Sequence, residues 1–503
     1  MDGLGFPESV IDALWSSPRT TAFEQGGRRV SRGELLELIW RWASTLREAG
    51  LGPGRGLAVC TAVSPEAFAA HIGAHVLGCR VVGVRPGYTA GQLAHVLGME
   101  VDSLVVDRSS ATPDLLAAAE ALAIPVLPLE ACGAERRPVD VTARPDDVAA
   151  LNFTSGSTGR PKGCAITYRA LGEHWAWQPR AWSPVARELS GAFERYLVFG
   201  TLASMVVMEF LALCVLGGGT AVIPEEDGRP LFPYAIERHG ITGSIITVPR
   251  LHRMLGVLGN EPVDVGGLRG LMVSGSPISP ARLAAAVERL GPVVYQGYGQ
   301  TEAGSISMLT PADIVRGPAH VLASVGRPHP GVEVSVRDGE IYVRSPYLMA
   351  GYWGDEAETG ETLRDGWLRT RDLGRVDEHG FLYLTGRTRD VIMVNAMVVY
   401  AGPIEGVLAR HPDVMEAYVV GTPDDRTGEA VHAFVVPRGG REPAADALRA
   451  LVRAELGADS VPQTITTVAG VPVAPSGKPD KAALLSVPAR RRSDRSLRIR
   501  REH

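Results

Sequence analysis

Short apolar runs rich in β-branched residues recur along the chain, and segments with helical spacing separate them. The runs cover residues 57–63, 80–84, 103–107, 197–200, 220–224, 243–249, 270–275 and 293–299. Strands that are apolar on both faces and alternate with helices are typical of parallel sheets covered by helices. We therefore predict an α/β fold in which the sheets are mostly parallel.

Segment 279–291 illustrates why the intervening segments are expected to be helices. Ser279 can cap the N-terminus, Pro280 lies in the first turn, and Gly291 follows the last turn. The most apolar segment, 196–223, contains Glu209 and three consecutive glycines, so it does not read as a membrane span of about 20 apolar residues. A buried helix leading into a strand is predicted there instead.

After residue 325 the pattern changes to alternating strands and tight turns, with a hairpin signal at Asp338-Gly339 and a second turn at 378–380. Beyond Gly386 the pattern indicates a strand, a helix, a hairpin and a second helix. We predict a large N-terminal domain over 1–386 that ends in a β-rich subdomain, and a small, mobile α+β domain over 387–488. The arginine-rich tail, 489–503, is expected to be disordered.

Composition limits the classes of partner. With 503 residues and a formal net charge of −5, the chain offers no basic surface of the kind that nucleic acid requires. Its five cysteines are scattered without a C-x-x-C pair, and its N-terminus lacks a secretory signal. We expect a cytoplasmic monomer or homodimer with neither a nucleic-acid nor a membrane partner.

Residues 152–163, NFTSGSTGRPKG, follow an apolar run and combine hydroxyls, glycines and a lysine. A phosphate accepts several hydrogen bonds at once, so its binding loop needs hydroxyl and backbone N–H donors. The hydroxyl donors here are Thr154, Ser155, Ser157 and Thr158. Gly156 and Gly159 let the backbone approach closely, and Lys162 supplies charge. The Walker spacing is absent. These residues alone leave open both an ordinary polar turn and a phosphate-binding loop.

The order Thr-Ser-Gly-Ser-Thr-Gly-x-Pro-Lys-Gly resembles the signature loop of the AMP-forming adenylating superfamily, which contains acyl-CoA synthetases, luciferases and adenylation domains of peptide synthetases. Further blocks resemble that family's adenine turn, Tyr-Gly-x-Thr-Glu block, ribose-binding segment, hinge and C-terminal lysine loop. They cover residues 274–277, 295–304, 366–374, 386–392 and 475–484. The resemblance implies that the loop binds the triphosphate of ATP.

The resemblance also implies a role for each matching residue. The implied nucleotide-binding residues are Thr154, Ser155, Gly156, Ser157, Thr158, Gly159, Lys162, Ser274, Gly275, Ser276, Tyr298, Gly299, Asp372, Arg387 and Lys478. Tyr298 offers a flat face to adenine, and Asp372 accepts hydrogen bonds from the ribose hydroxyls. Glu302 is the implied ligand of Mg²⁺.

Lys478 is the implied catalytic residue, assisted by Thr301 and Arg387. A carboxylate that attacks the α-phosphate brings two negative groups together, and a positioned ammonium offsets their repulsion as pyrophosphate leaves. Arg389 occupies the hinge position on which a domain rotation would depend.

The residues expected to line the acid pocket are Leu202 and Ala203, which replace an aromatic-histidine pair of many acyl-CoA ligases, and Gly297. No aspartate lies near Ser204 to hold a substrate ammonium, so an α-amino acid is disfavoured. Glu209 is expected to be structural. Tyr168 and Cys164 depart from the usual histidine and valine, which we interpret as altered packing.

The largest departure follows the hinge, where residues 394–397 read Val-Asn-Ala-Met instead of a Gly-Gly loop. Side chains there could narrow the path of a thiol. The leading hypothesis is an ATP- and Mg²⁺-dependent ligase that adenylates an aryl or medium-chain acid and passes the acyl group to CoA or a carrier protein. The alternatives are activation of nitrite for attack by an aryl amine, and a non-catalytic nucleotide-binding protein. No G-x-S-x-G motif supports a serine hydrolase.

Overall fold

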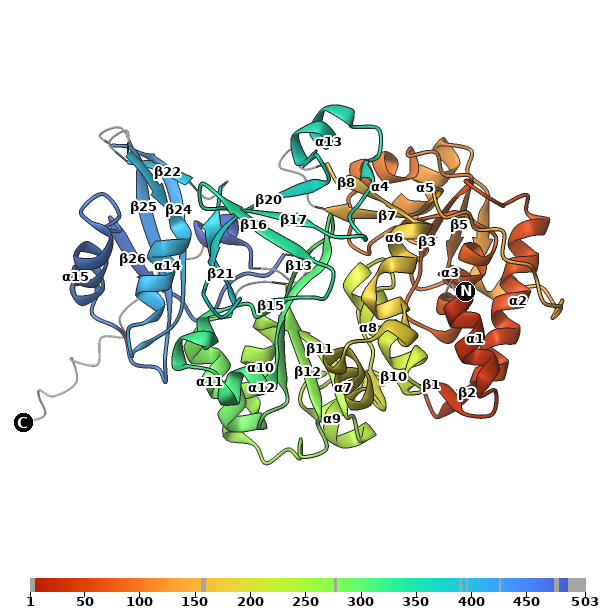
Figure 1. Ribbon diagram of the computed structural model, residues 1–503, viewed down its shortest axis with the longest axis horizontal. Coiled ribbons are helices and arrows are strands. Elements are labelled where there is room, and N and C mark those ends of the chain that lie inside the picture. The colour runs from red at the N-terminus through yellow and green to blue at the C-terminus, as the bar shows by residue number, and fades with distance from the viewer. Residues whose placement is uncertain are drawn as a thin grey trace, which may run out of the picture. The chain divides into compact units, whose positions relative to one another are not determined.

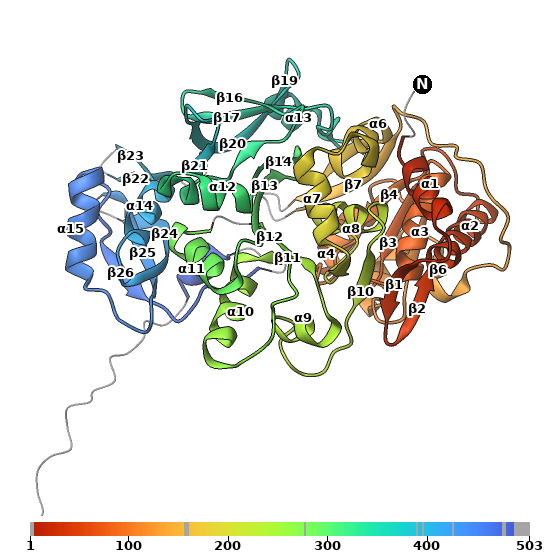
Figure 2. The ribbon, with the colours of Figure 1, turned by 60° about the horizontal axis from the view of Figure 1, so that its bottom comes forward.

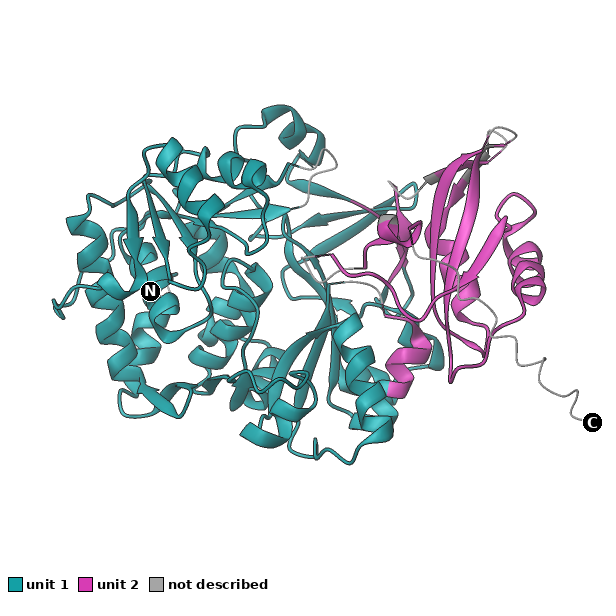
Figure 3. Ribbon diagram, turned by 180° about the vertical axis from the view of Figure 1, so that it is seen from behind, with its two compact units in different colours: residues 1–275, 286–370, 376–382 teal, residues 276–285, 371–375, 383–503 magenta. Residues whose placement is uncertain are grey.

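The computed structural model describes residues 5–154, 160–275, 278–388, 391–394, 397–424, 427–474 and 479–486 (Figure 1). The chain divides into two compact units, which Figure 3 distinguishes by colour. Unit 1 consists of residues 1–275, 286–370 and 376–382, and unit 2 consists of residues 276–285, 371–375 and 383–503.

The larger sheet of unit 1 has a parallel centre and antiparallel edges. Its order is β15 (Arg327–Pro328), β14 (Gly304–Leu309), β13 (Val294–Gln300), β12 (Gly270–Ser274), β11 (Gly243–Thr247), β9 (Arg195–Leu197), β10 (Thr220–Ile223), β1 (Thr21–Gln25) and β2 (Arg28–Ser31). The strands from β13 to β1 pair in parallel, whereas β2, β14 and β15 pair antiparallel with their neighbours. The β13–β14 hairpin is important for the site because Thr301 and Glu302 lie in its connection.

The second sheet of unit 1 is built in the same way. Its order is β18 (Gly351–Tyr352), β8 (Lys162–Thr167), β7 (Val148–Thr154), β4 (Arg80–Gly83), β3 (Gly56–Cys60), β5 (Ser103–Val106) and β6 (Val126–Pro128). The strands from β7 to β6 are parallel, and every residue of β3, β4 and β5 is buried. Burial on both faces explains why these strands read as continuous apolar runs. The prediction of mostly parallel sheets is confirmed for both sheets of unit 1.

Helices surround these sheets (Figure 2). They are α1 (Glu8–Ser16), α2 (Arg32–Glu48), α3 (Pro65–Val76), α4 (Ala90–Leu97), α5 (Pro113–Ala121), α6 (Tyr168–Glu173), α7 (Pro184–Ala192), α8 (Met205–Leu216), α9 (Tyr234–His239), α10 (Val248–Asn260), α11 (Pro280–Leu290), α12 (Pro311–Arg316) and α13 (Glu356–Thr362), with 3-10 turns η1 (Leu129–Ala131), η2 (Trp175–Trp177), η3 (Pro179–Ala181) and η4 (Ala319–Ala323). The predicted cap of α11 is confirmed, since the Arg282 N–H donates to Ser279 Oγ at 3.3 Å. Ser31 and Glu34 form a capping box that starts α2.

The main core of unit 1 lies among α1, α2, α3 and α8, with Trp42, Phe68 and Leu211 fully buried. The apolar segment 196–223 forms β9, α8 and β10, which confirms the predicted buried helix leading into a strand. In the part of the chain that the structure describes, no helix is both long and apolar enough to cross a membrane.

The predicted packing role of Tyr168 agrees with its contacts. Its hydroxyl donates to the carbonyl oxygen of Cys79 at 2.7 Å within the core. All five cysteines are free thiols, and Cys132 alone among them is not buried.

The β-rich region is a separate sheet within residues 333–387. Its strands are β16 (Glu333–Arg337), β17 (Glu340–Arg344), β20 (Trp367–Val376), β19 (Leu363–Arg364) and β21 (Leu382–Arg387). The hairpin of β16 and β17 turns at Asp338 and Gly339, both with positive φ, as the sequence predicted.

Unit 2 contains a sheet of its own, with helices α14 (Ala401–Ala409), α15 (Ala445–Leu456) and α16 (Lys481–Leu484). Its strand order is β23 (Met397–Tyr400), β22 (Val391–Val394), β25 (Gly428–Pro437) and β24 (Val414–Asp424), with β26 (Thr464–Thr467) beside β25. A separate apolar core joins these elements. It includes Ile404 and Leu408 from α14, Ala433 from β25, and Leu448 and Val452 from α15.

Candidate active site

The predicted phosphate-binding loop connects β7 to β8. Thr154 is the last residue of β7 and pairs in register with Lys162, the first residue of β8. Ser155, Gly156, Ser157, Thr158 and Gly159 lie outside the described residues. The structure thus places the two ends of the loop opposite each other, at the edge of the second sheet where β7 ends and β8 begins.

Lys162 is held at this edge by two groups. Its Nζ lies 3.0 Å from Glu358 Oε1, and the two side chains are 21% and 18% exposed. The same ammonium lies 5.3 Å from the centre of the Tyr352 ring. The ion pair orients the Lys162 side chain. Because both side chains are partly exposed, the ammonium is still accessible to a ligand.

Glu302 lies beside the same edge. Tyr352 donates its hydroxyl hydrogen to Glu302 Oε1 at 2.9 Å, and the Met349 N–H donates to the Glu302 carbonyl oxygen at 2.9 Å. Burial, and then the nearby Glu302, raise the pKa of Tyr352 well above its ordinary value, so the phenol stays protonated as a donor. Tyr352 therefore links the predicted metal ligand to Lys162. Thr301 is half-buried in the same turn.

The predicted adenine turn follows β12, and Gly297, predicted to line the acid pocket, lies on the neighbouring strand β13. Ser274 ends β12, and Gly275 follows it with φ of 93°, a conformation that favours glycine. On β13, a Cβ added at Gly297 would lie 3.2 Å from Met272 Sδ and 4.0 Å from the Ser274 Cβ. A side chain at position 297 would therefore crowd Met272 on β12. Ser276 lies outside the described residues.

Tyr298 and Gly299 precede the Glu302 turn. Tyr298 is largely buried and pairs with Ser307 across the hairpin, and the register shifts between Tyr298 and Gly299. A Cβ at Gly299 would overlap the carbonyl oxygen of Gly304, so this irregularity requires glycine.

Leu202 and Ala203 lie in the turn between β9 and α8, 3% and 5% exposed. Ala203 packs against β4, where a Cβ added at Gly83 would come within 3.1 Å of it. These contacts place the two residues in the apolar interior. They do not line the cavity that opens beside Phe199.

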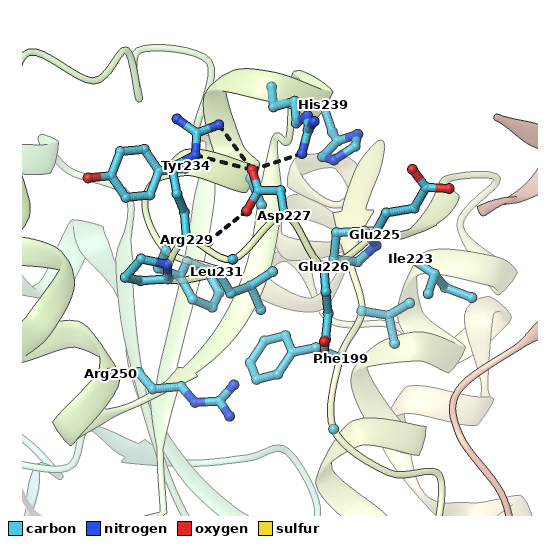
Figure 4. Close-up of a pocket in the computed structure, with 18 of the residues that line it drawn as sticks. Phe199, Ile223, Glu225, Glu226, Asp227, Arg229, Leu231, Tyr234, His239 and Arg250 are labelled. Atoms are coloured by element: carbon cyan, nitrogen blue, oxygen red, sulfur yellow. Dashed lines mark hydrogen bonds and ion pairs between the residues drawn. The ribbon is translucent and has the colours of Figure 1, made fainter. Parts of the chain in front are cut away.

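A cavity of about 590 Å³ opens in unit 1 beside the ends of β9 and β10, the loop 224–233, α9 and the start of α10 (Figure 4). Sequence reasoning did not identify it, because its loop 225–230, EEDGRP, matches no motif. Asp227 accepts hydrogen bonds from Arg229 at 3.0 Å and from Arg238 at 2.9 Å. The acidic group nearest these arginines is therefore already engaged.

Arg250 differs from those two arginines. Its guanidinium carbon lies 4.5 Å from the centre of the Phe199 ring (Figure 4). Phe199 packs edge-on against Phe232, with the ring centres 5.4 Å apart. Burial, and then the neighbouring Arg253, lower the pKa of Arg250 from its ordinary value. Among the described residues no carboxylate is within ion-pairing distance of Arg250. The cavity thus combines an aromatic wall, an arginine without an ion-pair partner among the described residues, and the carboxylates of Glu225 and Glu226, which also line it.

In unit 2, the predicted ribose-binding residues meet. Arg387 Nε lies 2.7 Å from Asp372 Oδ1; Asp372 is 3% exposed, whereas the Arg387 side chain is 56% exposed. The Thr388 N–H donates to the Arg371 carbonyl oxygen at 3.0 Å, which aligns the two segments. Arg389 and Lys478 lie outside the described residues.

Sequence reasoning missed Tyr352 and Glu358, which contact the predicted site residues Glu302 and Lys162. An aromatic-rich segment at 347–353 was the available signal. Among the described residues, no three or more His, Cys, Asp or Glu side chains are grouped so as to hold a metal ion.

Comparison with known proteins identifies the chain's family. Residues 13–353 match the model of the AMP-binding enzyme family, and residues 403–478 match that of the AMP-binding enzyme C-terminal domain. The chain belongs to the AMP-binding enzyme family. The resemblance and the fold class expected from the sequence motifs are thereby confirmed, and the chain is an AMP-forming ligase.

Three similar members of the AMP-binding enzyme family span nearly the whole length of this chain. A medium/long-chain-fatty-acid–CoA ligase of Mycobacterium tuberculosis is 30% identical, covering 94% of this chain and 88% of the relative. A feruloyl-CoA synthase of an Amycolatopsis species is 30% identical, covering 92% and 94%. The solved amide bond synthetase McbA of Marinactinospora thermotolerans is 34% identical, covers 95% and 98%, and superposes with a TM-score of 0.82.

Proposed function

We propose that this enzyme uses ATP to adenylate an aryl or medium-chain carboxylic acid and then transfers the acyl group to the thiol of CoA or of a carrier protein. The family match along both parts of the chain carries this proposal. The relatives named for fatty-acid and feruloyl thioesters support a carboxylic acid, and they favour it over nitrite. The five free thiols fit a reducing cytoplasm.

In the first step a carboxylate oxygen of the acid attacks the α-phosphorus of ATP, and the bond to the pyrophosphate oxygen breaks. Thr154 and Lys162 are assigned to the departing phosphates, together with the loop between them. Glu302 offers a hard oxygen ligand for Mg²⁺, which usually takes one or two carboxylates along with phosphate oxygens. When bound, Mg²⁺ offsets the charge of those phosphates.

The Asp372–Arg387 pair of unit 2 is assigned to the ribose and phosphate of the nucleotide. Asp372 is buried and would be costly without its partner, so Arg387 keeps the carboxylate oriented as an acceptor. In the second step the acceptor sulfur attacks the acyl carbonyl carbon and AMP leaves.

The cavity beside Phe199 is assigned to the acceptor. CoA carries phosphates and a flat adenine ring, which match the Arg250 cation and the aromatic wall formed by Phe199 and Phe232. The cavity lining includes none of the residues assigned to ATP.

The decisive experiment is acid-dependent exchange of labelled pyrophosphate into ATP, over a panel of aryl and medium-chain acids. Exchange with at least one acid is expected, and Lys478→Ala should lower its rate by about 10²–10³, as for the loss of one preorganised charge. The proposal fails if no acid supports exchange, or if AMP forms only when nitrite and an aryl amine are both supplied.

A second candidate function is amide bond formation, in which an amine attacks the acyl adenylate. The similarity to the amide bond synthetase of Marinactinospora thermotolerans favours it, and so does the replacement of the Gly-Gly loop by residues 394–397. Supplying either CoA or an amine to the adenylated acid, and identifying the acyl product by mass spectrometry, decides between the two acceptors.

A further inference from the structure

A buried polar group adjoins the turn that carries Glu302. Glu209, on α8, is 2% exposed, and Ser305 Oγ donates to its Oε1 at 2.6 Å. His174 Nε2 lies 3.9 Å from the other carboxylate oxygen. Ser305 follows Glu302 by three residues on the same hairpin, so the Glu209–Ser305 contact is joined to the proposed metal ligand by a short stretch of backbone.

The backbone of this short segment is fixed on more than one side. Tyr347 donates its hydroxyl hydrogen to the Ser305 carbonyl oxygen at 3.0 Å. Gly304 has φ of 65°, and a Cβ there would lie 3.2 Å from both His174 Nε2 and the Tyr347 ring. Position 304 therefore packs too closely for a side chain, and the Glu209–Ser305 contact holds the next residue.

No positive charge balances Glu209 among the described residues. The titratable groups that face it are His174 at the start of η2, Tyr196 on β9 and Tyr347, with His329 next to His174. Burial lowers the pKa of His174 to about 3 and that of His329 to about 4, so both rings are neutral near pH 7. Burial also raises the pKa of both tyrosines well above neutrality. A carboxylate in such surroundings is costly, which argues for a use beyond packing.

We propose that Glu209 and Ser305 are positioning residues that hold the Thr301–Glu302 turn ready for Mg²⁺ and the ATP phosphates. The inference rests on the proposed function, because it takes Glu302 as the metal ligand. A hydroxyl that donates to an ionised carboxylate forms a stronger hydrogen bond than one that donates to a neutral group. The turn is therefore held best when Glu209 is ionised.

The first test uses the nucleotide-free protein. Burial raises the pKa of Glu209 from 4.5 to about 7, against the opposing hydrogen bond from Ser305. Because the folded-state pKa is the higher one, the contribution of Glu209 to stability is fully present below about pH 4.5 and is lost as the pH rises through 7. Glu209→Gln removes the ionisation, so its Tm relative to wild type should rise between pH 5 and pH 8. A Tm difference independent of pH would overturn the inference.

The second test measures how the Thr301–Glu302 turn affects pyrophosphate exchange and Mg²⁺–ATP binding. Ser305→Ala should slow acid-dependent pyrophosphate exchange about tenfold and weaken Mg²⁺–ATP binding in calorimetry, with the KM for the acid unchanged and the loss recovered in Ser305→Thr. The wild-type exchange rate should rise with pH near 7 as Glu209 ionises, and Glu209→Gln should remove that rise. The matched control is Ser307→Ala, on the same strand, whose buried hydroxyl instead donates to the Val325 carbonyl oxygen at 2.8 Å.

The inference fails if Ser305→Ala behaves like Ser307→Ala, or if the pH profiles of Glu209→Gln and wild type superimpose. Either result in an active wild-type enzyme would overturn this inference alone. A wild-type enzyme without any exchange would overturn the proposed function and, with it, the inference.

Discussion

Tyr352 joins the two charged residues of the candidate site, so removing its hydroxyl tests whether their arrangement matters. Tyr352→Phe keeps the ring beside Lys162 but removes the donor to Glu302. A hydrogen bond to a charged group is worth about 1.5–3 kcal/mol, so we expect acid-dependent pyrophosphate exchange to slow at least about tenfold. Tyr342→Phe, on β17 and outside the site, is the control. Equal exchange rates in both variants would contradict the role of Tyr352.

Individual residues also mark the limit of what the sequence reveals. Motifs identify Lys162 and Glu302, because phosphates and Mg²⁺ demand particular side chains at particular spacings. They do not identify Tyr352 and Glu358, which contact those residues from far along the chain. Such contacts depend on how β18 and α13 pack, and no local spacing encodes them.

The β13–β14 hairpin depends on Gly299, which faces the carbonyl oxygen of Gly304 with no room for a side chain. Gly299→Ala should displace the hairpin at its irregular register and reduce pyrophosphate exchange at least tenfold, while the rest of the sheet stays folded by circular dichroism. Gly360→Ala is the control, because a Cβ there meets nothing within 4 Å. Full exchange activity in Gly299→Ala would show that the hairpin geometry is not needed.

Most elements could be predicted because burial on both faces leaves a visible pattern, as in β3 and β4. Strand direction could not, since an apolar run looks the same whichever way it pairs. The antiparallel strands β8 and β14 were not among the predicted runs at all, because neither is a continuous apolar segment. The cavity beside Phe199 was also not predictable, because residues from four separate segments form it.

The reaction as a whole divides into two steps, and Arg250 is assigned only to the second. Arg250→Ala should raise the KM for CoA about tenfold, a loss of about 1.4 kcal/mol of binding, and leave acid-dependent pyrophosphate exchange unchanged. Arg169→Ala, an exposed arginine paired with Asp146 outside the cavity, is the control. An unchanged KM for CoA would remove the cavity from the acceptor site.

The exposure of the cysteines predicts where the folded protein can be labelled with a thiol-reactive dye. Cys60, Cys79, Cys164 and Cys214 are buried, and burial raises the pKa of each thiol, to about 11 for Cys60 and about 12 for Cys79 and Cys214. Burial raises the pKa of the Cys132 thiol too, but Cys132 is partly exposed whereas the other four are buried, so the native protein should take up about one dye per chain, slowly and at Cys132. Mass spectrometry of peptides from labelled protein checks this, and labelling of all five thiols without denaturant would contradict it. If Cys132 alone is labelled, a cysteine introduced into unit 2 can carry a second fluorophore. Energy transfer between the two fluorophores would then report any movement between the units during turnover, and no native cysteine would need to be replaced.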